Sequence, residues 1–348
     1  MSETELIAEA VGELLRDRCT AEAADEAERV GWAPELWAEL SAHGYCRIGV
    51  PESAGGEGGT VAHACTVLEQ VGRAGAPLPV AEAGLLGGWL LAAAGLPVPP
   101  EPVTTAPAPG VTLQAGRLRG VVHRVPWARA AGQLVMLTGD QVVTVDPKTV
   151  PIRPGANLAG EPRDTLVLDG VVPSAVSTVD VTEDDLFVRG ALSRAALIAG
   201  AAARIREITV RYTGERVQFG RPIGKFQAVA AHLVRIAEAA ETAAMACRTA
   251  AANAGTGEPS ISDVAAAKTV ASEAAGLIAA AAHQATGAMG MTREYELGRL
   301  TRRLWSWRDE YGGDRMWSVR LGEYLIDSGA DALWPALARG ALRHPTHT

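Results

Sequence analysis

The chain has 348 residues, 48% of them hydrophobic, and carries a formal net charge of −8 at pH 7. This length allows two or three structural units around a large core, and an acidic chain of ordinary composition gives no reason to expect nucleic-acid binding. The four cysteines contain no CxxC pair, so neither a zinc site nor a dithiol redox site is expected. Isolated cysteines are typical of buried thiols in a reducing compartment, and the expected location is therefore cytoplasmic.

Residues 1–98 are predicted to form an N-terminal helical domain. Residues 32–59 predict a short helix that stops at Gly44, followed by a glycine-rich loop, and helical periodicity then resumes. The apolar run at residues 80–99 is interrupted by Glu82 and by proline, so it predicts a buried helix or helix pair and no membrane span. Apolar residues also recur at helical spacing near the start of the chain, at Leu6, Ile7, Ala10, Val11, Leu14 and Leu15.

The composition changes near residue 97, where a small middle β-domain is predicted over residues 99–182. Residues 97–110 (PVPPEPVTTAPAPG) are interpreted as a proline-rich linker. Beyond it, short runs rich in valine and threonine alternate with turn residues, which is typical of strands. These runs cover residues 111–125, 132–147 and 164–173.

Residues 183–348 are predicted to form a C-terminal helical bundle. Four long amphipathic runs, three of them rich in alanine, cover residues 186–220, 226–255, 261–290 and 317–340, and a basic helix precedes the last of them. Short loops between long helices favour an antiparallel four-helix bundle, and alanine allows close helix approach. The predicted fold class is therefore multi-domain α+β, with an N-terminal helical domain, a small β-domain and a C-terminal four-helix bundle.

A polar, basic segment, RYTGERVQFGRPIGKFQ at residues 211–227, separates the first two bundle helices. Its part RVQFGRPIGKFQAVAAHL (216–233) closely matches the most specific motif of the acyl-CoA dehydrogenase family, which the chain resembles over nearly its whole length. Residues 36–59 are similar to the family's N-terminal helix and Gly-Gly loop, and residues 283–303 to its later flavin-contacting segment. The three matches come in the family's order around a β-domain, which implies the acyl-CoA dehydrogenase fold.

In the resembled family, the motif at residues 216–227 binds the diphosphate and adenine side of FAD across a subunit interface. The residue types suit that role, because a guanidinium such as that of Arg216 can bind a phosphate through two hydrogen bonds. Gln218 can donate and accept, Phe219 offers a flat apolar face, and Gly220 lets the backbone approach closely. Gln227 follows at the start of the next helix. Alone, Arg216 would be typical of a solvated arginine near a helix end.

The resemblance also implies that Gln284, Gly287 and Gly290 contact the FAD bound mainly by the neighbouring subunit. The two glycines could instead form only a helix C-cap. His283, directly before Gln284, is interpreted as a core or interface histidine rather than a catalyst.

The family's reaction requires a carboxylate that takes the α proton while the flavin accepts a hydride from the β carbon. The resemblance places this glutamate either directly before a glycine in the loop after the basic helix or directly before an arginine in the first bundle helix. Here these positions hold Tyr311 and Ser193, and neither is a ready base near neutral pH. Glu310 could serve as the catalytic base if the register shifts by one residue. Alternatively, Glu310 belongs to a solvated cluster of charged residues at 308–315.

Some actinobacterial relatives in steroid side-chain breakdown pair two different subunits, of which one lacks the base, in an α2β2 assembly. The missing glutamates favour that interpretation, as does a short β-domain whose proline-rich segment lacks the family's Gly-Ser pair. The main hypothesis is an FAD-dependent acyl-CoA dehydrogenase subunit acting on a bulky or steroid-type acyl-CoA. Its expected partners are the acyl-CoA substrate, an electron-transfer flavoprotein and a homologous subunit or a second copy, with neither nucleic acid nor membrane.

Three alternatives stay open on the sequence alone. The first is a homomeric acyl-CoA dehydrogenase with Glu310 as base. The second is a non-catalytic structural partner subunit that keeps the fold without binding flavin. The third is a related flavin enzyme that uses oxygen or acts on a carrier-protein thioester.

Overall fold

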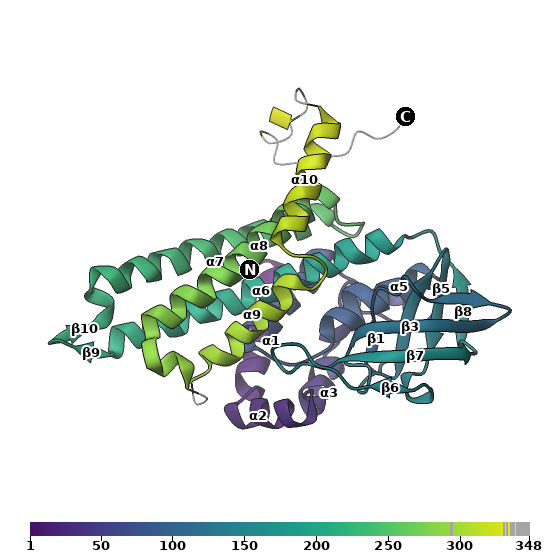
Figure 1. The fold of residues 1–348 in the computed structure, drawn as a ribbon, viewed down its shortest axis with the longest axis horizontal. Coiled ribbons are helices and arrows are strands. Elements are labelled where there is room, and N and C mark those ends of the chain that lie inside the picture. The colour runs from purple at the N-terminus through teal and green to yellow at the C-terminus, as the bar shows by residue number, and fades with distance from the viewer. Residues whose placement is uncertain (293–294, 330, 332, 335–337, 339–348) are drawn as a thin grey trace. The chain divides into compact units, whose positions relative to one another are not determined.

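The computed structural model describes residues 1–292, 295–329, 331, 333, 334 and 338. The chain forms two compact units, and their elements are labelled in Figure 1. The N-terminal unit contains Met1–Leu68 and Ala76–Gly190, and the C-terminal unit contains Glu69–Gly75 and Ala191–Thr348. The predicted fold class is confirmed, with N-terminal helices, middle sheets and C-terminal helices. The three-domain division at residues 98 and 182 stays a prediction.

Helices form the first part of the N-terminal unit, and their ends follow local capping rules. Ser2 starts the first helix with a capping box that includes Glu5, and Gly31 ends the second in the left-handed conformation. Gly44 also has a positive φ just after the third helix, as the predicted stop requires. The apolar run after residue 80 forms a buried π-helical turn and a short helix. The helices are α1 (Glu3–Arg18), α2 (Ala21–Val30), α3 (Pro34–Ala42), α4 (Val61–Ala74), η3 (Glu82–Leu86) and α5 (Gly87–Ala93).

Two four-stranded sheets form the rest of this unit, in the orders β1-β4-β5-β8 and β2-β3-β7-β6. Their shared core includes Leu118, Val122, Leu134 and Leu166, all with no exposed surface. The strands are β1 (Val103–Thr105), β2 (Thr112–Gln114), β3 (Arg117–Pro126), β4 (Gln133–Thr138), β5 (Gln141–Val145), β6 (Ile152–Arg153), β7 (Arg163–Val171) and β8 (Ala175–Thr178).

The proline-rich linker is predicted incorrectly in part, because it contains strand β1. This strand pairs in parallel with β4, and both of its threonines are fully buried. Its prolines flank the strand at Pro102 and Pro107, where the missing N–H groups do not interrupt the pairing with β4. The segment is therefore part of a sheet.

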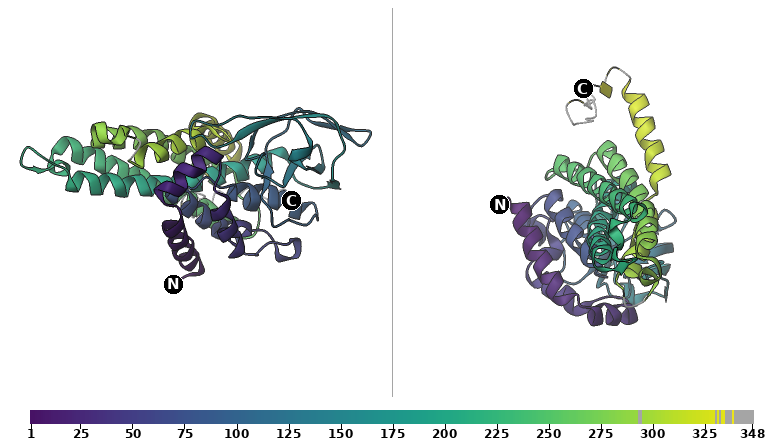
Figure 2. Two further views of the ribbon diagram at one scale, coloured as in Figure 1. Left: turned by 90° about the horizontal axis from the view of Figure 1, so that it is seen from below. Right: turned by 90° about the vertical axis from the view of Figure 1, so that its left-hand side faces the viewer.

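Long helices make up the C-terminal unit and run side by side in Figure 2, coloured teal to green. Glycines allow the end of α4 to pack closely on α6 within this unit. A Cβ atom on Gly72 would lie 2.1 Å from the Leu197 carbonyl oxygen, and one on Gly200 would lie 1.8 Å from that of Glu69. The helices are α6 (Glu183–Glu215), α7 (Gln227–Ala254), α8 (Ile261–Thr286), α9 (Leu297–Asp309) and α10 (Asp314–Ser328). Helix α9 is the predicted basic helix, and the predicted run at 317–340 lies partly outside the described residues.

Two segments in the described part of the chain are long and apolar enough to cross a membrane by length and composition, at Glu183–Glu215 and Ile261–Met291. In the structure, 89% and 61% of their most apolar windows are buried inside the protein. Buried core helices of globular proteins share this composition, and packing explains the apolar character of both segments.

Candidate active site

The predicted phosphate-binding segment forms a β-hairpin between α6 and α7. Strands β9 (Val217–Gln218) and β10 (Arg221–Pro222) pair across a turn at Phe219 and Gly220, whose φ angles are 53° and 80°. Two positive φ angles are typical of a tight hairpin turn, for which glycine is favourable and phenylalanine is strained. The family motif predicted these residues as a binding segment but did not predict the hairpin, which depends on Gly220 in the turn.

The hairpin exposes its functional candidates. Phe219 is 93% exposed, and its ring makes an edge contact with Phe226 at 6.1 Å between centroids. Arg216, Gln218 and Gln227 are also exposed, and the Arg216 guanidinium forms no ion pair with another described residue. The left-handed backbone at Phe219 costs about 1–3 kcal/mol, and strained residues of this kind cluster at binding sites.

The second predicted flavin segment lies at the end of α8. Gln284 is exposed, and Gly287 ends the helix with a φ of 59°, so the C-cap interpretation of Gly287 is confirmed. Gly290 is buried and closely packed. A Cβ atom there would lie 2.2 Å from the Thr286 hydroxyl oxygen and 3.1 Å from Leu297. Gly290 therefore serves packing inside the chain. Flavin contact by Gln284, Gly287 and Gly290 stays a prediction.

His283 does not have the geometry of a catalyst. Its Nε2 lies 3.1 Å from the Thr301 hydroxyl on α9, and burial lowers the pKa of the imidazole. This contact joins α8 to α9, as expected for a core or interface histidine.

Contacts with the last turns of α6 bring the two segments to one end of that helix. The Tyr295 hydroxyl donates to the Ile208 carbonyl at 2.9 Å, and Arg204 binds Glu296 through two hydrogen bonds of 2.7 and 3.1 Å. Arg211 adds a longer ion pair of 3.8 Å to Glu296. The residues just before α9 are therefore bound to the C-terminal half of α6, the helix that leads into the hairpin, although the two motifs lie far apart in the sequence.

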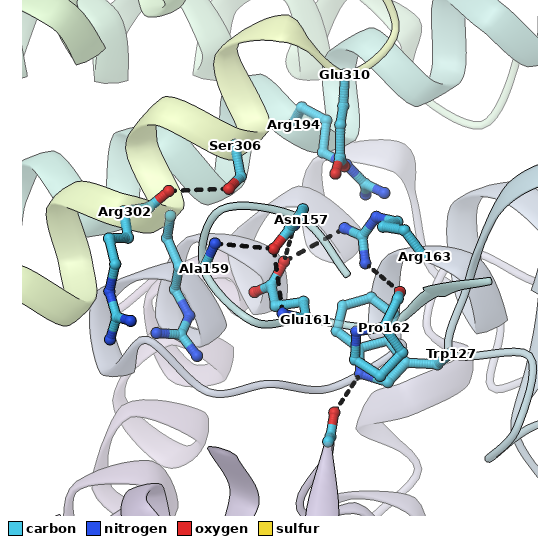
Figure 3. Close-up of polar contacts among 12 residues, drawn as sticks. Trp127, Asn157, Ala159, Glu161, Pro162, Arg163, Arg194, Arg302, Ser306 and Glu310 are labelled. Carbon is cyan, nitrogen blue, oxygen red and sulfur yellow. Dashed lines mark hydrogen bonds and ion pairs between the residues drawn. The ribbon is translucent and has the colours of Figure 1, made fainter. Parts of the chain in front are cut away.

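Folding also brings together the two places where the family's base was expected. The Arg194 Nε donates to Glu310 Oε2 at 2.7 Å, and the two side chains are only 1% and 8% exposed (Figure 3). Ser193 is fully buried and its hydroxyl accepts from Arg194 at 3.3 Å, while the Arg194 guanidinium lies 5.3 Å from the centre of the Tyr311 ring. The interpretation of Glu310 as part of a solvated charge cluster is wrong, because its carboxylate is buried against Arg194.

The turn between α9 and α10, which carries Glu310, is stabilised by contacts from neighbouring helices. Tyr311 has a φ of 54° and Gly312 a φ of 85°, and the Trp317 indole donates to the Tyr311 carbonyl at 2.7 Å. Lys268 on α8 also binds the end of α9, and the sequence analysis missed this residue. The only signal that could have found it is a single lysine within an alanine-rich helix.

A second polar cluster that the sequence analysis missed lies in the N-terminal unit. Arg163 and Glu161 form an ion pair of 3.3 Å with 3% and 1% exposed side chains, and Asn157 donates to Glu161 at 2.8 Å (Figure 3). Arg163 also stacks on Trp127, whose indole donates to the Gly31 carbonyl at 3.2 Å. These contacts join the loop before β7 to the end of α2, so the cluster supports the fold of this unit.

Comparison with known proteins agrees with this arrangement of motifs. Residues 1–97 match the N-terminal domain of acyl-CoA dehydrogenases, and residues 181–308 match their C-terminal domain. Over 307 residues the chain is 32% identical to the acyl-CoA dehydrogenase IpdE2 of Mycolicibacterium smegmatis, which covers 85% of this chain and 90% of that protein.

Two solved structures have the same fold. One is the ChsE4–ChsE5 complex from Mycobacterium tuberculosis, with a TM-score of 0.85 and 24% identity over 95% of this chain and 99% of the other. The second is a variant of the Tcur3481–Tcur3483 steroid ACAD, with a TM-score of 0.83 and 24% identity over 94% and 99% of the two chains. With the two domain matches and the IpdE2 similarity, these findings show that the chain belongs to the acyl-CoA dehydrogenase family.

Proposed function

We propose that the chain is an FAD-dependent acyl-CoA dehydrogenase subunit that acts on a bulky or steroid-type acyl-CoA with a second, base-bearing subunit in an α2β2 assembly. The observation that carries the proposal is the buried Arg194–Glu310 ion pair. Glu310 lies one residue before Tyr311, which holds one of the two positions expected for the family's base. The other expected position holds Ser193. Similar complexes of two chains, one of them a steroid acyl-CoA dehydrogenase, support the heteromeric form.

The cofactor fits the residues that the hairpin presents. Arg216 would bind the diphosphate of FAD, with Gln218 and the backbone at Gly220 beside it and the Phe219 ring against the adenine side. Each of these groups is exposed and has few contacts within the chain, so binding would not require the loss of internal structure. Gln284 and Gly287 would contact the FAD held mainly by a neighbouring subunit. Bound FAD supplies the hydride acceptor for the oxidation of the Cα–Cβ bond.

Glu310 is poorly placed to act as a base in this structure. Its carboxylate would have to leave the 2.7 Å contact with Arg194 before it could take a substrate proton. Separating a buried ion pair costs about 3–5 kcal/mol. This cost would slow proton removal by roughly two to four orders of magnitude, since each 1.36 kcal/mol is a factor of ten in rate. A base in a second subunit avoids it.

The homomeric alternative rests on one specific observation, which is that Glu310 provides a carboxylate on the turn where the family's base is found. In the homomeric enzyme Glu310→Gln would abolish turnover, whereas in the heteromeric enzyme turnover would persist. Asp309→Asn is the matched control, because the Asp309 side chain is the next carboxylate in sequence and is 67% exposed.

The test is co-expression of the chain with a homologous subunit that carries a glutamate at the Ser193-equivalent position. Visible flavin absorbance and turnover of several acyl-CoAs are then measured for the chain alone and for the complex. The proposal expects turnover only in the yellow complex, where Glu310→Gln lowers stability without abolishing turnover and Asp309→Asn changes neither. Strong turnover by the chain alone that Glu310→Gln abolishes would establish the homomeric enzyme. A colourless complex would support a structural subunit, and peroxide formation would support an oxygen-using enzyme.

The same proposal includes an electron-transfer flavoprotein as the acceptor of the electrons and the cytosol as the compartment. Cys19, Cys46, Cys65 and Cys247 form no disulfide with one another, which supports a reducing compartment. Reduction of an added electron-transfer flavoprotein by the substrate-loaded complex is the measurement that tests the acceptor.

A further inference from the structure

Lys268 is a fully buried lysine in a chain that has only three lysines. It lies on α8, and its Nζ has three hydrogen-bond acceptors. These are the Arg308 carbonyl at 2.7 Å, the Trp307 carbonyl at 3.1 Å and the Ser272 hydroxyl at 3.1 Å. The three donors of an ammonium group are therefore all used, which is the condition for keeping such a group in a protein interior.

The two carbonyls belong to the end of α9, which stops at Asp309. The last carbonyls of a helix have no partner within the helix and carry its partial negative charge. Lys268 supplies both the donors and the positive charge that this end needs. The Ser272 hydroxyl donates to the Arg308 carbonyl as well, at 3.1 Å, so α8 provides two adjacent side chains for the same task.

The chain reverses direction directly after this contact. Glu310 leaves the helix in an extended conformation, Tyr311 follows with a φ of 54°, and Trp317 holds the Tyr311 carbonyl from α10. The turn is therefore held by α8 on one side and by α10 on the other. Between these two anchors, Glu310 contacts Arg194 on α6.

We propose that Lys268 is the positioning residue of the turn at 309–313, which it fixes through the last carbonyls of α9 so that Glu310 stays paired with Arg194. The proposed function enters this inference only by placing the turn beside the acyl thioester. If the chain uses a base from a second subunit, Lys268 keeps Glu310 in its ion pair. If the chain is homomeric, Lys268 sets the position of the base itself.

Charged groups on α6, at the end of α9 and in the turn face Lys268. Arg194 on α6 and Arg308 on α9 repel the ammonium, while Glu310 and Asp309 attract it. The Asp309 side chain is well exposed and bound to Arg308, whereas the Glu310 carboxylate is buried and paired with Arg194. Loss of the Lys268 charge would therefore change both the backbone contact and the electrostatic balance of the Arg194–Glu310 pair.

The test compares Lys268→Met, which keeps the length of the side chain without its donors, with Lys148→Met at an exposed lysine in the short 3-10 helix Pro147–Thr149 of the N-terminal unit. Hydrogen exchange of the segment 305–317 and the side-chain NMR signal of the Arg194 Nε–H are measured in the protein as purified. The proposal expects Lys268→Met to speed exchange at 309–313 at least tenfold and to remove the Arg194 signal, as Glu310→Gln does. Lys148→Met is expected to leave both unchanged.

A folded Lys268→Met variant with wild-type exchange at 309–313 and an intact Arg194 signal would overturn the proposal. If that variant does not fold, Ser272→Ala is measured in its place. This change removes one hydrogen-bond acceptor of Lys268 and one hydrogen-bond donor to the Arg308 carbonyl. Faster exchange confined to the turn in Ser272→Ala supports the proposal, and wild-type exchange there refutes it. Neither measurement needs flavin or substrate, so a chain that binds no flavin would refute the proposed function without affecting this test.

Discussion

Replacing Lys268 by methionine is expected to change the stability of the protein in a pH-dependent way. Burial lowers the pKa of Lys268 from its ordinary value of 10.5 to about 7, and the charge of Arg194 acts in the same direction while Glu310 opposes it. Between these two pH values the unfolded chain binds a proton at this position that the folded chain does not bind. The free energy of unfolding contributed by Lys268 therefore rises with pH over this interval.

The magnitude follows from the two pKa values. From pH 7 to pH 9 the unfolded lysine stays protonated, whereas the folded one goes from about half protonated to almost fully neutral. Integrating the proton difference at 1.36 kcal/mol per unit gives about 2 kcal/mol for this interval. The wild type is expected to gain this amount relative to Lys268→Met as the pH rises, because methionine does not titrate.

Urea unfolding of the wild type, Lys268→Met and Lys148→Met at pH 7, 8 and 9 measures the effect. Subtracting the variant from the wild type at each pH cancels all groups that titrate alike in both proteins. The expected difference grows with pH for Lys268→Met and stays constant for Lys148→Met. A difference for Lys268→Met that stays constant to within about 0.5 kcal/mol, or that falls with pH, would show that Lys268 stays fully charged in the folded protein.

Two further predictions concern the helices and the hairpin of the C-terminal unit. Gly200→Ala is expected to destabilise the protein by more than about 3 kcal/mol, since its Cβ atom would lie 1.8 Å from a backbone oxygen. At Gly298 in α9, a new Cβ would have no atom within 4 Å, so Gly298→Ala is expected to stabilise the protein by about 0.5–1 kcal/mol. Thermal unfolding of the two glycine variants measures both effects. Arg216→Ala is expected to weaken flavin binding at least tenfold without lowering the melting temperature of the flavin-free chain, whereas Arg235→Ala on the exposed face of α7 changes neither. Equal flavin retention by the two arginine variants would remove the basis for the phosphate contact.

Much of the fold could be predicted from the sequence because its signals are local. The stop at Gly44 depends on a residue that tolerates a positive φ, and the long helices of the C-terminal unit depend on periodicity within each run. Strand β1 was missed for the opposite reason. Its residues Val103, Thr104 and Thr105 become a strand by pairing with β4, about 30 residues later, and nothing within a proline-rich segment reports that pairing.

The candidate site divides in the same way. The hairpin residues Arg216, Gln218 and Phe219 lie close together in the sequence, and a family motif covers all of them. Arg194 and Glu310 are separated by 116 positions, and neither has a local pattern that indicates its partner. The solvated-cluster interpretation of Glu310 was wrong for this reason, since its carboxylate is buried against Arg194, which lies far from it in the sequence.

The sequence by itself determined the helices, the middle strands and the family motifs, because backbone hydrogen bonding, apolar periodicity and turn residues act over a few positions. Only the tertiary structure decided that Lys268 is buried and that Glu310 is held by Arg194. Burial and ion pairing depend on which distant elements pack together, and that packing is set by the summed contacts of whole helices rather than by the residues that become paired.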